Sequence, residues 1–175
     1  FAGGTSANAS GANSIAIGGS MEEKEIDDPD NSGKKKKVVL AANAVGNNAI
    51  ALGTQSNAHG DNSIAQGKGA IAGVDNAIAI GTNAAANGTD TPAGSSNAQN
   101  AGTAISIGAN SVATGVATTS LGQAAKATQN GAVAIGSLAN ATNKAAAALG
   151  RDSLASGESS TALGSGAKAQ GQYSF

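Results

Sequence analysis

Short runs in which large aliphatic and small residues alternate recur along the chain, and each run ends at a glycine. The first clear run is Ser14-Ile15-Ala16-Ile17-Gly18, and nine copies of it start at residues 14, 49, 63, 77, 104, 118, 132, 146 and 160. Where nothing is inserted, the spacing between copies is 14 residues. Alternation with a period of two predicts a β-strand with one buried face. Each copy is therefore expected to begin with a short strand.

The rest of each period predicts a second strand between two turns. Counting the start of a copy as position 1, positions 8 and 10 carry Ala or Ser, as at Ala84 and Ala86, and positions 12–14 are rich in Gly and Asn. Position 5 is Gly in all nine copies, which suits a sharp turn with a positive φ angle. These predicted turn glycines are Gly18, Gly53, Gly67, Gly81, Gly108, Gly122, Gly136, Gly150 and Gly164.

Strand, turn, strand and turn make one coil of a parallel β-solenoid. Successive coils pair at about 4.8 Å, so roughly ten coils form a rod roughly 45–50 Å long. A 14-residue helical repeat is disfavoured because glycine in register destabilises a helix. The fold class predicted from this pattern is all-β.

The residue types suggest which face of each strand points inward. Positions 2, 4, 8 and 10 are predicted to fill the interior, with large aliphatics opposite alanines. At position 4 this predicted coil core consists of Ile17, Leu52, Ile80, Ile107, Leu121, Ile135, Leu149 and Leu163, while Gln66 interrupts the series. Gln66 is expected either to hydrogen-bond to a backbone group or to mark a bulge.

The other face of the first strand, positions 1 and 3, carries only small, uncharged residues. A face open to water would be expected to carry charged residues, so positions 1 and 3 are predicted to pack against further copies of the chain. Positions 7, 9 and 11 are varied and often polar, as at Asn57, Lys126 and Lys168, and are predicted to face water.

Composition supports a thin stack of small residues. The 175 residues include 26 Gly but only 2% aromatic and 12% charged residues, against about 25% charged in a typical soluble domain. A formal net charge of −1 and a 40% hydrophobic content argue against a disordered chain. Such a chain lacks the large side chains of a thick core.

The sequence offers no catalytic chemistry, metal site or cofactor site. There is no cysteine, and the single histidine, His59, is predicted at an outward position. No glycine-rich segment has the context of a phosphate-binding loop. No apolar run reaches the roughly 18–20 residues of a membrane-spanning helix, and no signal peptide is recognised. The protein is therefore not expected to be an enzyme, to bind a cofactor or to bind nucleic acid.

The repeats resemble those of a known family. The units Ser14-Ile15-Ala16-Ile17-Gly18, Ala77-Ile78-Ala79-Ile80-Gly81 and Ala132-Val133-Ala134-Ile135-Gly136, each followed by an Ala-x-Ala-like strand, are similar to the haemagglutinin-type head repeats of trimeric autotransporter adhesins with YadA-like heads. The resemblance implies a left-handed parallel β-roll with three chains around one axis, and adhesion to host matrix or cells. It also implies display on the bacterial outer membrane through a stalk and anchor outside this chain, and hence a single head domain, residues 1–175, of a longer protein.

Two insertions interrupt the period. The first copy is followed by a spacing of 35 rather than 14, so 21 residues are added at about 19–39; the spacing of 27 after residue 77 adds 13 residues near 89–102. The first insertion holds the basic run Lys34, Lys35, Lys36 and Lys37. This run is a candidate contact for sulfated glycans or acidic partners; in the alternative interpretation it pairs with the acidic run before it.

The other acidic residues of this insertion do not predict a metal site. Asp27, Asp28, Asp30 and Asn31 lack the spacing and the closing Glu of a calcium loop.

A homotrimeric, non-enzymatic adhesin that binds a host matrix protein or a cell-surface glycan is therefore the leading hypothesis. The alternatives are a purely structural spacer of the adhesin fibre and an ice-binding type of solenoid. An ice-binding solenoid needs threonine repeated at one position, whereas the threonines here are scattered.

Overall fold

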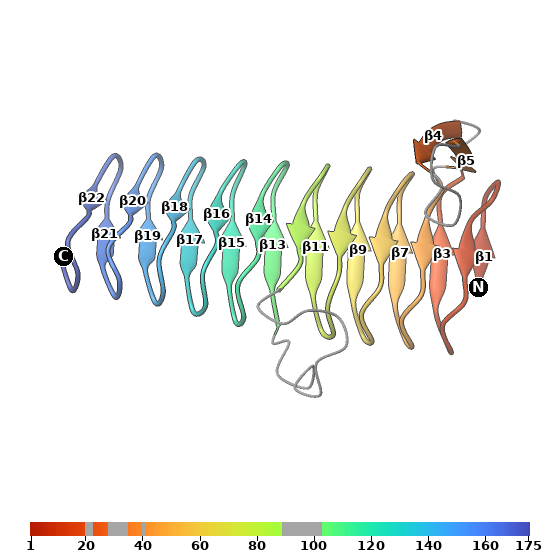
Figure 1. The fold of residues 1–175 in the computed structure, drawn as a ribbon, viewed down its shortest axis with the longest axis horizontal. Coiled ribbons are helices and arrows are strands. Elements are labelled where there is room, and N and C mark those ends of the chain that lie inside the picture. Colours follow the sequence, from red (N-terminus) through yellow and green to blue (C-terminus); the bar gives the residue numbers. More distant parts are fainter. Residues whose placement is uncertain (20–22, 28–34, 40, 89–102) are drawn as a thin grey trace.

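The computed structural model describes residues 1–19, 23–27, 35–39, 41–88 and 103–175. Every regular element in these ranges is a β-strand, as the repeat predicted. Two parallel sheets of ten strands run the length of the molecule, and the chain passes from one to the other twice in each coil (Figure 1).

The first sheet contains the strands with the aliphatic alternation. They are β1 (Ala2–Gly3), β3 (Ile15–Ile17), β7 (Ile50–Leu52), β9 (Ile64–Gln66), β11 (Ile78–Ile80), β13 (Ile105–Ile107), β15 (Thr119–Leu121), β17 (Val133–Ile135), β19 (Ala147–Leu149) and β21 (Thr161–Leu163).

The second sheet contains the shorter strands of positions 9 and 10. They are β2 (Asn8–Ala9), β6 (Asn43–Ala44), β8 (Asn57–Ala58), β10 (Ile71–Ala72), β12 (Ala85–Ala86), β14 (Val112–Ala113), β16 (Lys126–Ala127), β18 (Asn140–Ala141), β20 (Leu154–Ala155) and β22 (Lys168–Ala169).

The register never slips along either sheet. Each residue pairs with its equivalent in the next coil, as Ala51 does with Ala65 and Ala134 with Ala148. The pairing continues across both insertions, where Ala16 pairs with Ala51 and Ala79 with Ser106. The fold is therefore a β-solenoid of about ten coils, as predicted.

The turn after each first-sheet strand has the predicted geometry. The nine glycines at position 5 have φ angles from +119° to +144°, a region that other residues rarely adopt. A Cβ at Gly53 would also lie 2.9 Å from the carbonyl carbon and oxygen of Gly67 in the next coil. Glycine is therefore required here both for its φ angle and for the close stacking of successive turns.

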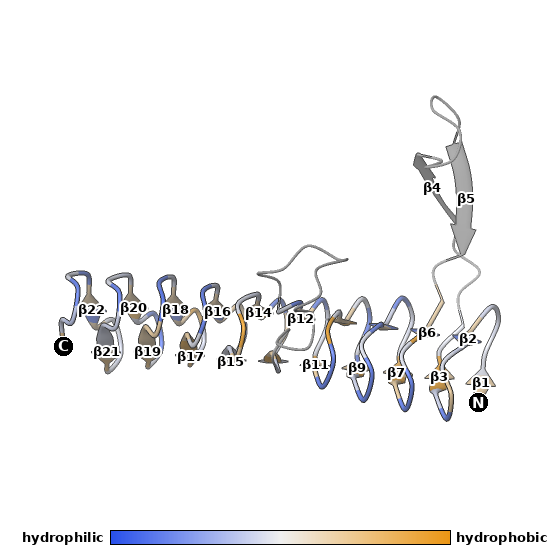
Figure 2. Ribbon diagram, turned by 60° about the horizontal axis from the view of Figure 1, so that its bottom comes forward, coloured by the Kyte–Doolittle hydropathy of each residue, from blue (hydrophilic) through white to orange (hydrophobic). Residues whose placement is uncertain are grey.

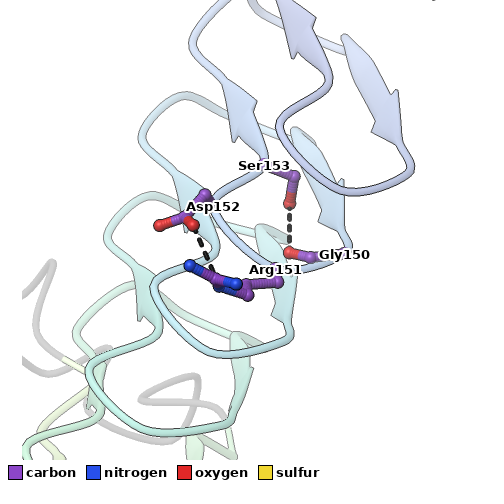
Figure 3. A network of polar contacts seen from close by, with 4 residues as sticks. All are labelled: Gly150, Arg151, Asp152 and Ser153. Atoms are coloured by element: carbon purple, nitrogen blue, oxygen red, sulfur yellow. Dashed lines mark hydrogen bonds and ion pairs between the residues drawn. The ribbon is translucent and has the colours of Figure 1, made fainter.

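Figure 3 shows one such turn, from Gly150 to Ser153. The Ser153 hydroxyl donates a hydrogen bond to the Gly150 carbonyl at 2.8 Å. Asp152 has a φ of +56°, and its carboxylate lies 3.1 Å from Arg151 Nε. Buried serines close the opposite turn in the same way, as Ser63 does by donating to the Gly60 carbonyl at 2.6 Å. Serine can thus replace alanine in the interior because its hydroxyl finds a turn carbonyl.

The interior is built from positions 1, 3, 8 and 10, so the predicted orientation of the first strand is wrong. Ala49, Ala51 and Ala58 are 0% exposed, as are most of their equivalents. The large aliphatics point the other way, with Ile17 46% and Leu163 62% exposed. The coil core predicted at position 4 is thus incorrect for Ile17, Leu52, Ile80, Ile107, Leu121, Ile135, Leu149 and Leu163, which are half-buried or exposed on the outer face.

The physical reason is the narrow cross-section of the coil. Strands of two or three residues joined by tight turns bring the two sheets so close that alanine and serine fill the space between them. This also explains Gln66: it is exposed on the outer face and pairs in register with Leu52 and Ile80, without a bulge.

The first insertion leaves its coil intact. In an ordinary coil the position-8 amide donates to the position-5 carbonyl, as Ser56 does to Gly53 at 3.1 Å; across the insertion Ala42 donates to Gly18 at 2.8 Å. The insertion contains an antiparallel pair, β4 (Glu23–Asp27) and β5 (Lys35–Val39). The second predicted insertion, 89–102, lies outside the described residues.

Candidate binding surfaces

The outer face of the first sheet is a mainly aliphatic surface, interrupted by Gly3, Gln66, Thr119 and Thr161. It consists of positions 2 and 4 from coil to coil, and no charged residue occupies either position in any coil. Ile15, Ile17, Ile107, Ile135 and Leu163 are between 36% and 62% exposed. Figure 2 shows hydrophobic colours along the strands and hydrophilic ones around many turns. An exposed apolar surface of this kind marks an interaction site.

The outer face of the second sheet is mixed in character. Asn57 is half-buried, and Lys126, Lys168 and His59 are exposed, so all four face outward as predicted. However, Asn57 lies on β8, Lys126 on β16 and Lys168 on β22, so they do not form one patch.

The basic run of the first insertion lies partly on β5. The backbone register places Lys35 opposite Asp27 and Lys37 opposite Glu25 in the antiparallel pair. Lys34 lies outside the described residues. Both interpretations of the basic run, contact with a partner and pairing with the acidic run before it, remain predictions.

An asparagine ladder on the second sheet was not predicted. Asn8 Nδ2 donates to Asn43 Oδ1 at 2.8 Å, and Asn43 Nδ2 donates to Asn57 Oδ1 at 3.5 Å. The signal was present in the sequence, because these residues share position 9 of successive coils. They line a depression of about 390 Å³ together with Ser6, Ala41, Ala42, Gln55 and Ser56.

A second set of polar ladders follows the turn at positions 13 and 14. Asn48 Nδ2 donates to Asn62 Oδ1 at 3.1 Å, and the Asp61 carboxylate accepts the Asn47 backbone amide at 2.7 Å. Asn48 and Asn62 have φ angles of +55° and +56°, a conformation that asparagine tolerates. These ladders join successive turns and thus have a structural role.

The described residues provide neither a metal cluster nor a membrane-spanning helix. In those ranges no three His, Cys, Asp or Glu side chains gather where they could hold an ion. No helix long and apolar enough to cross a membrane is found in the part of the chain that the structure describes.

The family model of the YadA head domain repeat agrees with this coil architecture. It matches residues 3–20, 44–72, 75–91, 113–139, 127–153, 141–167 and 155–175, which together are more than half of the chain. The chain is similar to the crystal structure of the collagen-binding domain of the Yersinia adhesin YadA, with 23% identity, a TM-score of 0.49, and coverage of 87% of this chain and 76% of that chain. No curated protein sequence matches.

The family match rests on the repeat that builds the coils, and its segments include both sheets and their turns. The family is one of adhesins and not of enzymes. The chain therefore belongs to the YadA head domain repeat family, the YadA-like heads of trimeric autotransporter adhesins.

Proposed function

We propose that the chain is the head of a homotrimeric adhesin that attaches a bacterium to host extracellular matrix or cell-surface molecules. Membership of the adhesin family supports the adhesive role, and the similar Yersinia YadA domain is a collagen-binding domain. On this proposal the chain is displayed at the bacterial surface by an anchor outside this sequence.

The observation that supports the trimer is the aliphatic outer face of the first sheet. The prediction that positions 1 and 3 pack against further copies of the chain is wrong, because those positions are buried inside the coil. Positions 2 and 4 supply an apolar face for association instead. Ile17, Ile107 and Leu163 are between 38% and 62% exposed in the single chain, and covering them removes apolar surface from water.

Further copies of the same chain are the best occupants of this face. A copy has the same spacing between coils, so the aliphatic residues of one chain can meet those of another at most levels along the rod. The absence of charge on positions 2 and 4 suits association around a rotation axis, where equivalent residues approach one another.

Sedimentation equilibrium and a binding array test the two parts of the proposal. The purified chain is expected to sediment at three times the 16.4 kDa mass of one chain and to bind at least one protein on an array of matrix proteins and glycans. A folded monomer at micromolar concentration contradicts the trimer. A trimer that binds no component of the array favours the structural spacer.

The ice-binding alternative receives little support. Thr114, Thr128 and Thr142 do share position 11 of successive coils, but they make a single short row. The neighbouring position 9 of the same coils holds Val112, Lys126 and Asn140 rather than a second row of threonine.

A further inference from the structure

We infer that the depression over β2, β6 and β8 binds an uncharged, hydroxyl-rich ligand, namely a neutral saccharide unit. The inference refines the proposed adhesive function, on which its biological meaning rests. The depression measures about 390 Å³, which lies at the small end of the range for ligand pockets. Its outer lining is Ser6, Asn8, Ala41, Asn43, Gln55 and Asn57.

The depression exists because the first insertion interrupts the stacked turns of successive coils at one coil. Ser6 and Gln55, at position 7 of the flanking coils, have φ angles of +60° and +63° and close tight turns. Position 7 of the coil between them is Ala41, the first coil residue after the insertion. The depression is therefore a local feature of the second coil rather than a property of every repeat.

Among the described residues, the lining is mostly polar and carries no ionisable side chain. Elsewhere on this face position 9 is occupied by Ile71, Ala85, Val112, Lys126, Asn140, Leu154 and Lys168. Asparagine therefore stands at position 9 of three consecutive coils only here. A pocket without charge does not select for sulfate or carboxylate groups, and one without large apolar side chains does not select for an apolar ligand.

The amide ladder leaves hydrogen-bonding groups available at both ends. Among the described residues, Asn8 Oδ1 accepts no hydrogen bond and Asn57 Nδ2 donates none, while Asn43 links the two at 2.8 and 3.5 Å. The ladder thus offers an acceptor at one end of the depression and a donor at the other. Sugar hydroxyls, each of which both donates and accepts, complement such a row.

An extended peptide fits this place less well. A peptide that adds to a sheet needs free backbone groups. Here the backbone N–H groups of Asn8 and Asn43 already donate to the Ala42 and Ser56 carbonyls of the next coil, at 2.9 and 2.8 Å. The described lining residues also include none of the aromatic side chains found in grooves that bind proline-rich segments.

Variants at position 9 give a matched test. In Asn43→Leu the ladder is cut in the middle of the depression, whereas Asn140→Leu makes the same change on β18, away from it. Leucine is compatible with this position because Leu154 occupies it on β20. The probes are an array of uncharged oligosaccharides, with host glycoprotein glycans and bacterial exopolysaccharide units as separate sets, and sulfated counterparts of each.

The chain is expected to bind members of one neutral set, and that set identifies the source of the ligand. Asn43→Leu should weaken the binding at least tenfold, Asn140→Leu should leave it within twofold, and sulfated counterparts should bind no better. Absence of neutral-saccharide binding, equal binding by both variants, or binding only of a peptide overturns the inference. If the trimer still binds a matrix protein in those cases, the proposed function survives while this inference fails.

Discussion

At the scale of single residues, two requirements govern the coil: a glycine where the chain turns and a small side chain where the sheets meet. The first requirement is strict only at some glycines. Gly53 has a φ of +123° and abuts Gly67 of the next coil, whereas Gly131 has a φ of +69° and its nearest neighbour to an added Cβ is 3.8 Å away. Ala117 and Ala145 already occupy the equivalent position beside Gly131 with φ angles of +54° and +51°.

Gly53→Ala is therefore expected to destabilise the protein and Gly131→Ala to leave it nearly unchanged. The first substitution combines an unfavourable φ with a steric clash, which together cost about 1–3 kcal/mol or more, and about 2–4 °C of Tm is lost for each kcal/mol in a chain of this size. Thermal unfolding, followed by circular dichroism, measures the Tm of both variants. Equal melting temperatures would contradict the role assigned to position 5.

Interior alanines are expected not to tolerate a larger side chain. Ala134 is 0% exposed between the sheets, so Ala134→Leu should cost about 1–3 kcal/mol by overpacking. Lys126→Leu, on the outer face of β16, is the matched control because it introduces the same residue where Leu154 is accepted two coils later. Chemical denaturation of both variants checks the prediction, and a stable Ala134→Leu would mean that the interior holds unfilled space.

At the scale of elements, the first insertion is separable from the coil that contains it. Gly18 and Ala42 make their turn hydrogen bond across it at 2.8 Å. Removing residues 20–40 joins Gly19 to Ala41 and restores a 14-residue coil, with an alanine at position 7 as at Ala124, whose φ is +53°. Each coil contacts mainly its neighbours, so no distant element depends on the insertion.

The variant lacking residues 20–40 should thus keep the circular dichroism spectrum and Tm of the parent within about 2–4 °C, a change worth about 1 kcal/mol. A large loss of stability would show that the insertion belongs to the scaffold. If the lysines of this insertion contact a sulfated glycan, the same variant should bind that glycan less tightly and with a weaker dependence on salt.

At the scale of the whole molecule, the two outer faces are expected to differ in what an added charge does. Ile107 on the first sheet and Ile71 on the second are both 38% exposed in the single chain. Ile107→Asp places a carboxylate on the proposed trimer face, where desolvation without a partner costs several kcal/mol. Ile71→Asp places the same group on the face that remains in water.

Ile107→Asp is expected to remain folded and to sediment near the 16.4 kDa of one chain, while Ile71→Asp remains trimeric. Sedimentation velocity and circular dichroism of the two variants, measured at one concentration, separate association from folding. If both variants stay trimeric, the aliphatic face of the first sheet is not the interface. If Ile107→Asp unfolds even when dilute, the residue supports the coil itself.

The sequence by itself determined the period, the turns and the two parallel sheets. These follow from local rules: glycine at a positive φ and alternation of period two are visible without knowing what packs on what. The coil of β1 does not show the repeat pattern clearly in the sequence, because Gly3 stands where later coils, apart from the one with Gln66, have Ile or Leu.

Only the tertiary structure decided which face of the first strand points inward. An alternating strand has two faces, and the pattern does not say which one is buried. The assumption that large aliphatics lie inside failed because the space between the sheets admits only small residues, namely alanine, serine and Thr118. The depression on the second sheet also needed the structure. Asn8, Asn43 and Asn57 share a repeat position in the sequence. The depression beside them, however, lies where the chain re-enters the coil at Ala41 after the first insertion and the stacking of the turns is interrupted.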